Sequence, residues 1–139
     1  MKRHESLAPL SREHHGTLIL AQLLKRNAPE YKGLPTDTEG KIKYAAGFYQ
    51  QNLMQHFSKE EVMFEKVKHT NAAIEKLAEE IYAEHTVLRN KFLLLNTASD
   101  KETALDELGN MLEAHIRKEE RVLFPLIQKH CSEELLSLL

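Results

Sequence analysis

The chain has 139 residues, of which 42% are hydrophobic and 29% charged, as is ordinary for a globular protein. This length suits one domain with a buried core, and we expect a single domain over residues 1–139. The formal net charge of −2 excludes the strongly basic surface that nucleic acids or anionic membranes attract, so we expect neither partner. A single cysteine, Cys131, excludes an internal disulfide and a multi-thiolate metal site, and it favours a cytoplasmic location.

Hydrophobic residues at helical spacing, with only 5 Gly and 4 Pro in the chain, predict four long helices. The first is expected from about residue 11, where Ser11 is a good N-cap, to residue 27. Residues 28–38 contain Pro29, Gly33 and Pro35 and are expected to form a loop. The second helix is expected to begin at residue 37 or 38 and to end near residue 68.

The third helix is expected over residues 71–96, and the fourth begins after Ser99 or Asp100, either of which can cap it. Pro125 should end or kink the fourth helix, and a short amphipathic tail follows over residues 132–139. Short connections between long helices favour antiparallel neighbours. The sequence therefore predicts an all-α fold, an antiparallel up-down-up-down four-helix bundle over about residues 7–126 with a short C-terminal helical tail.

Each predicted helix presents at least one histidine on its apolar face. The expected inward residues are Leu10, His14, Leu18 and Ala21 in the first helix, Ile42, Ala46, Tyr49, Leu53, His56, Glu60, Met63 and Val67 in the second, Ile74, Ala78, Ile81, His85, Leu88 and Phe92 in the third, and Leu105, Leu108, Leu112, His115, Glu119, Val122 and Leu126 in the fourth.

Two of these helices carry the same pair, a histidine four residues before a glutamate. His56 with Glu60 and His115 with Glu119 each place an imidazole and a carboxylate on one helix face. A charged glutamate is costly to bury unless something compensates it, and a shared metal centre would do so. Counting about 1.5 Å per residue from the turns puts the histidines of all four helices within one or two turns of one level. The predicted metal ligands are His14, His56, Glu60, His85, His115 and Glu119.

Four imidazoles and two carboxylates form a nitrogen and oxygen donor set that suits iron, manganese or zinc. If both carboxylates bridge and the imidazoles are terminal, the set holds two metals. With an oxo or hydroxo bridge added, about two coordination positions stay open. Two exchanges of ligand remain possible from the sequence, because His15 follows His14 and Glu120 follows Glu119.

These residues resemble those of the hemerythrin-like (HHE cation-binding) family over roughly residues 7–126. The matching elements are Glu13-His14, His56 with Glu60, Glu84-His85, and His115 with Glu119 followed by Leu123-Phe124-Pro125. The resemblance implies two iron ions (Fe²⁺/Fe³⁺) in a non-haem centre inside a four-helix bundle. It also implies reversible oxygen binding, sensing of oxygen or iron, or handling of nitric oxide or peroxide.

Two positions depart from the oxygen-carrying hemerythrins. Those proteins have a further histidine one turn before the position of His85, where this chain has Ile81, and they space the fourth-helix carboxylate five residues from its histidine, which is where Glu120 stands. The missing histidine favours a more reactive centre over a simple carrier. We therefore expect a di-iron protein that binds or reacts with a small diatomic or peroxide ligand, the alternative being an iron- or oxygen-sensing module without turnover.

Overall fold

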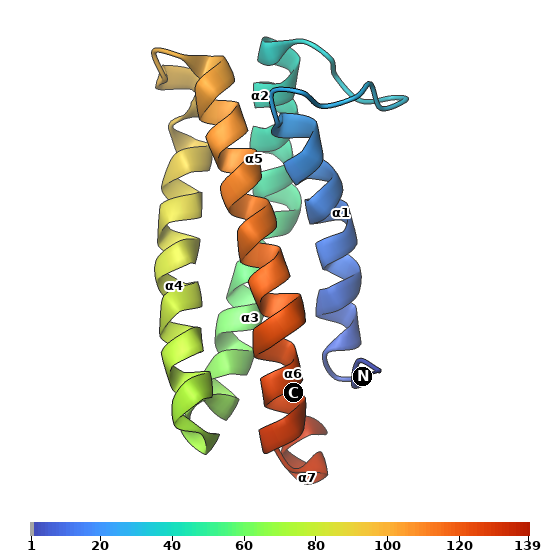
Figure 1. Cartoon of the computed structure of the whole chain (residues 1–139), viewed down its shortest axis with the longest axis vertical. Helices are drawn as coiled ribbons and strands as arrows, with labels where there is room; N and C mark the ends of the chain where they lie inside the picture. Colours follow the sequence, from blue (N-terminus) through green and yellow to red (C-terminus); the bar gives the residue numbers. More distant parts are fainter. Residues whose placement is uncertain (1) are drawn as a thin grey trace.

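A computed structural model describes residues 2–139 of the chain (Figure 1). These residues form helices and no strand, which confirms the predicted all-α class and a helical bundle. The α-helices are α1 (Ala8–Leu24), α2 (Thr38–Phe48), α3 (Met54–Val67), α4 (Ala72–Leu93), α5 (Lys101–Lys118), α6 (Phe124–His130) and α7 (Glu133–Leu136). Two π-helices, η1 (Tyr49–Leu53) and η4 (Glu119–Leu123), join α2 to α3 and α5 to α6. Two 3₁₀ turns, η2 (Lys68–Thr70) and η3 (Leu95–Thr97), follow α3 and α4.

Side-chain caps fix the starts of the helices at the predicted places, with one exception. Asp37, Asn71 and Asp100 each accept a hydrogen bond from a backbone N–H in the first turn of α2, α4 and α5. The start predicted for the first helix is wrong, because α1 begins at Ala8 and carries proline in its first turn, where no N–H is needed. Ser11 is therefore inside the helix, and its hydroxyl donates to Glu120 Oε2 at 2.8 Å.

The helix that contains Pro125 continues past it to His130, so the predicted end is wrong. In the π-helix before it, each N–H bonds to the carbonyl five residues earlier, as Phe124 N–H does to the Glu119 carbonyl. On that pattern proline leaves the Glu120 carbonyl without a donor, and Arg3 Nη2 supplies one at 2.9 Å. The chain thus stays helical through a proline.

The same π-helix shifts which residues face inward. The π-helix adds one residue to its turn. As a result Leu123 and Ile127 are buried, instead of the predicted Val122 and Leu126. Val122 is 44% exposed, whereas Leu123 is completely buried. By contrast, the predicted inward face of the third helix is buried at every position.

The helices lie side by side along the long axis of the molecule, and the connections 25–37 and 94–100 lie at the opposite end from 68–71 (Figure 1). Gly33 turns the first of these loops with φ +82°, a conformation that other residues rarely adopt. Gly109 lets α5 approach α1 closely, because a Cβ there would lie 2.6 Å from the Ala21 carbonyl oxygen.

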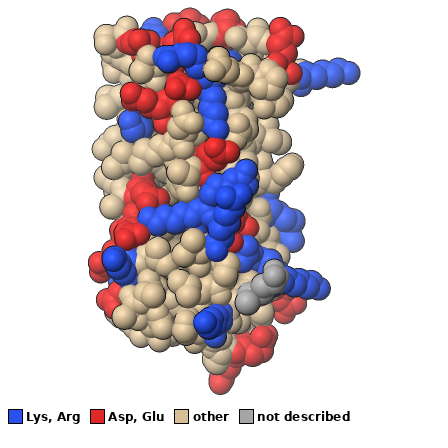
Figure 2. Space-filling model, in the orientation of Figure 1, with Lys and Arg blue, Asp and Glu red and all other residues tan. Residues whose placement is uncertain are grey.

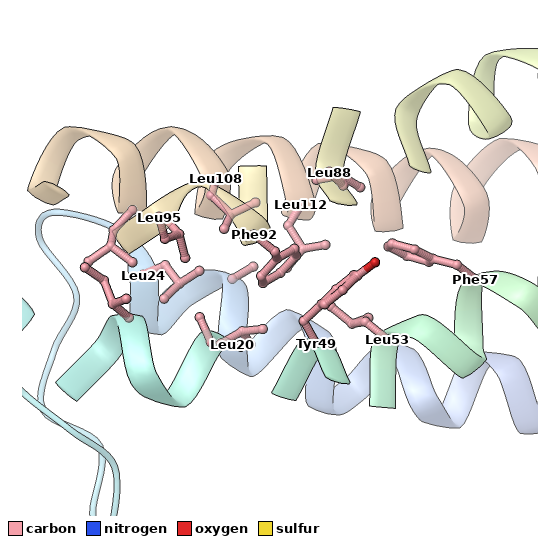
Figure 3. Packing of buried hydrophobic residues seen from close by; sticks show 14 residues of the cluster. Leu20, Leu24, Tyr49, Leu53, Phe57, Leu88, Phe92, Leu95, Leu108 and Leu112 are labelled. Atoms are coloured by element: carbon pink, nitrogen blue, oxygen red, sulfur yellow. The ribbon is translucent and has the colours of Figure 1, made fainter. Parts of the chain in front are cut away.

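Two separate apolar clusters fill the bundle. One is shown in Figure 3 and runs from Leu24 and Leu95 to Phe57, with the Tyr49 and Phe92 rings stacked at 5.0 Å. The other contains Leu10, Phe64, Ile81, Phe124 and Ile127. The buried polar side chains, apart from Thr17, are histidines and glutamates that belong to neither cluster.

The surface is mixed in charge. Figure 2 shows Lys and Arg interspersed with Asp and Glu on the face that it presents. None of the helices described combines the length and the apolar character needed to cross a membrane.

Candidate metal centre

Four helical segments deliver buried histidines and glutamates to one place. His14 lies on α1, His56 and Glu60 on α3, His85 on α4 and His115 on α5, and Glu119 is the first residue of η4. None of these six residues is more than 2% exposed. The structure thus brings together all six residues that the sequence singled out as ligands.

The six residues divide into two overlapping donor sets. His14 and His56 form the first set with Glu60 and Glu119, and His85 and His115 form the second with the same two glutamates. Within each set, one donor atom from every residue lies within 4.8 Å of the others. We call the first set site A and the second site B. Two carboxylates shared between two pairs of imidazoles is the arrangement expected for a pair of metal ions with bridging carboxylates.

The Nε2 atoms of all four imidazoles point at the shared carboxylates. Glu60 Oε2 lies 3.2 Å from His14 Nε2 and 3.1 Å from His56 Nε2, whereas Glu60 Oε1 lies 3.2 Å from His85 Nε2. Each oxygen of Glu60 therefore serves a different site. Glu119 Oε1 lies 3.0 Å from His115 Nε2 and 3.6 Å from His14 Nε2, so it also faces both sites.

Several of these donor atoms lack a hydrogen-bond partner among residues 2–139. They are His56 Nε2, His115 Nε2 and both carboxylate oxygens of Glu119. A buried polar atom without a partner costs about 1–3 kcal/mol, so such atoms are rare in folded proteins. All of them lie in the two donor sets, where a cation would satisfy them. The residues present therefore fit a metal pair.

The Nδ1 atom of each histidine is hydrogen-bonded to a glutamate outside the two donor sets, which we call an outer glutamate. The Nδ1–carboxylate contacts are His14 with Glu120 at 2.6 Å, His56 with Glu13 at 2.9 Å, His85 with Glu61 at 2.7 Å and His115 with Glu84 at 2.7 Å. An Nδ1–H donated to a carboxylate fixes the tautomer and ring orientation and leaves Nε2 available to a metal. The pattern is that of histidines prepared for metal binding.

These four outer glutamates form a closed ring around the bundle. Glu13 of α1 holds the histidine of α3, Glu61 of α3 holds that of α4, Glu84 of α4 holds that of α5, and Glu120 of η4 holds that of α1. The sequence did not predict which histidine each of these glutamates contacts. The sequence does contain a pattern that indicates them, because each outer glutamate is adjacent in sequence to one of the six inner residues. Adjacent residues are about 100° apart around a helix, so each outer glutamate faces a neighbouring helix.

The structure separates the residues that the sequence left as alternatives. His15 is exposed, whereas His14 is in the central layer. Glu119 is in the central layer, whereas Glu120 lies outside it and holds His14. Ile81, which stands where the oxygen carriers have a further histidine, is completely buried in the apolar cluster next to the site.

The acids of the site hold protons tightly on the imidazoles when no metal is present. Burial lowers the pKa of His14, but hydrogen bonds with Glu120 and Glu60 outweigh burial and raise the pKa to about 10. Burial also lowers the pKa of His115, but the charge of the adjacent Glu119 and the hydrogen bond with Glu84 raise it to about 9.

Ionising both of the shared carboxylates is unfavourable in the metal-free protein. Burial and the charge of Glu60 raise the pKa of Glu119 to about 8. Burial also raises the pKa of Glu60, but the close approach of Glu119, His14 and His56 brings that pKa well below its ordinary value. Protons thus occupy the positions where the donor atoms could instead bind metal.

Aromatic rings from the two apolar clusters close the centre on both sides. Phe57 stacks on His85 with ring centroids 4.0 Å apart, and it lies edge-on to His115 with ring centroids 5.9 Å apart. Phe124 stacks on His14 at 5.6 Å. Both phenylalanines are almost completely buried, so they keep water from the histidines and fix the ring planes.

Comparison with known proteins places the chain in a family. A family model described as the hemerythrin HHE cation binding domain matches residues 6–130, which includes every residue of both sites. No curated protein and no solved structure matches the chain. Because the match covers nearly the whole chain and the buried His/Glu donor sets lie within it, this protein belongs to the hemerythrin HHE cation-binding family.

Proposed function

We propose that this protein is a non-haem di-iron protein that binds or reacts with dioxygen, nitric oxide or peroxide. In this proposal His14, His56, His85 and His115 are terminal ligands and Glu60 and Glu119 bridge the two ions. The observation that carries it is the pair of four-residue donor sets that share both carboxylates. The orphaned donor atoms and the family match support the same centre.

A bound iron pair supplies one- and two-electron redox chemistry, which suits a diatomic or peroxide partner. The protein contributes a dry, fixed site. Phe57 and Phe124 exclude bulk water, and the outer carboxylates hold the Nδ1 protons in place. Ile81 offers no donor atom, so site B has two imidazoles, the same number as site A. This favours a reactive centre over a carrier, because the oxygen carriers have a further imidazole at that position.

The proposal includes an antiparallel up-down-up-down order of the four helical rods and a cytoplasmic location. The placement of the connections at alternate ends supports the order (Figure 1). The lone buried thiol of Cys131 supports a reducing compartment.

The test is an air titration of protein loaded anaerobically with Fe²⁺, with iron content and optical absorption measured before and after re-evacuation. Irreversible conversion to a ferric spectrum is expected, and nitric oxide and peroxide would then be tried as substrates. A colour that disappears when oxygen is removed would favour the carrier or sensor alternative instead. Retention of less than two irons per chain, with Glu119→Ala no worse than the unaltered protein, would refute the proposed centre.

A further inference from the structure

The four outer glutamates differ in the cations that accompany them. At site A each outer carboxylate is matched by one base. Glu13 Oε2 accepts from Lys59 Nζ at 3.0 Å, and Glu120 Oε1 accepts from Arg3 Nη2 at 3.1 Å. Ser11 also donates to Glu120. The negative charge that these acids bring to site A is therefore locally balanced.

At site B the acids outnumber the bases. Lys118 Nζ is shared between Glu84 at 2.8 Å and Glu80 at 2.7 Å. No Lys or Arg nitrogen of residues 2–139 lies within 4.0 Å of the Glu61 carboxylate, whose one ion-pair contact is with His85 at 2.7 Å. Lys68, the first residue of η2 and seven residues after Glu61, is paired with Glu65 and not with Glu61. The two outer glutamates of site B, together with Glu80, thus have one base between the three of them.

An unpaired carboxylate acts on a neighbouring metal site in two ways. Its charge attracts a cation over several ångströms, and it draws more strongly on the Nδ1 proton, which makes Nε2 a better electron donor. Glu61 is 40% exposed, so water screens part of the first effect, whereas the hydrogen bond to the buried His85 is unaffected by exposure. A base paired with the carboxylate, as at Glu13, reduces both effects.

We infer that the two sites are inequivalent and that site B, with His85 and His115, binds the first divalent cation more tightly than site A, because its outer carboxylates lack matching bases. The inference rests on the proposed metal centre but not on iron or on any reaction. Glu61 acts here as a positioning residue through His85. Changes at such positions commonly alter metal affinity by about 10- to 100-fold.

The test uses Zn²⁺, which is redox-inert, added to metal-free protein with ¹⁵N-labelled histidine and followed by NMR. With one equivalent of Zn²⁺, the His85 and His115 signals should move to their bound positions while those of His14 and His56 remain largely unbound. Earlier binding at His14 and His56, or equal occupancy of both pairs, would overturn the inference while leaving the metal centre intact. No binding at any of the four would overturn both.

Matched variants then assign the cause. Glu61→Gln and Glu13→Gln each keep an oxygen that can accept from Nδ1 and remove one charge. The first should weaken the tighter Zn²⁺ step about tenfold or more, and the second should weaken the other step by less. Lys59→Met, which leaves Glu13 without its base, should tighten the weaker step. Equal effects of the two Gln variants on the same step would contradict the assignment, and melting of the metal-free variants checks that each still folds.

Discussion

Metal binding to this centre should depend steeply on pH, because ions must displace protons that the folded site holds tightly. At pH 7 at least three groups of the metal site have pKa values above the solution pH, namely His14 at about 10, His115 at about 9 and Glu119 at about 8. Filling both sites should therefore release about three protons, so the overall affinity rises about a thousandfold per pH unit, or about 4 kcal/mol. Ordinary imidazoles would give a dependence that ends near pH 6.5.

The assay is competition between the protein and a chelator for Zn²⁺ between pH 6 and 8.5, with proton release measured by calorimetry in buffers of different ionisation enthalpy. Release of fewer than one proton at pH 7, or an affinity that is flat above pH 6.5, would refute the reasoning. The metal-free protein should show the opposite trend. Because the two histidines have raised pKa values, their contribution to stability is complete below about pH 6.5 and is lost as the pH rises toward about 10.

Two other sets of variants test the site and the packing. His56→Ala and Glu119→Ala should each lose at least one metal by elemental analysis, while His130→Ala, at the exposed end of α6, should keep both; equal metal content in all three would disprove the assignment. Gly109→Ala should lower the free energy of unfolding by about 1–3 kcal/mol in denaturant titrations, because its Cβ would lie 2.6 Å from a backbone oxygen of α1. Gly47→Ala is the control, since its Cβ meets nothing within 4 Å and should stabilise the helix by about 0.5–1 kcal/mol, and an equal loss in both would exclude the close contact as the cause.

Periodic patterns along single helices could be interpreted from the sequence because they depend only on local geometry. The inward face of α4, from Ile74 to Phe92, follows from a regular repeat of 3.6 residues per turn. The same rule failed at Val122 and Leu126, because the π-helix η4 inserts one residue into the turn that contains Val122 and precedes Leu126. Arg3 helps to stabilise that turn although it lies far away in sequence, so no local sequence pattern predicts the π-helix.

The sequence by itself predicted the helical class and six inner residues, because two helices carry a histidine four residues before a glutamate and all four helices place a histidine near one level. Only the tertiary structure decided that the two oxygens of Glu60 face different sites, and that Glu120 holds His14 instead of facing the centre. The reason is physical. Which neighbour an adjacent glutamate meets depends on the rotation and level of a second helix, and these are set by packing across the whole bundle.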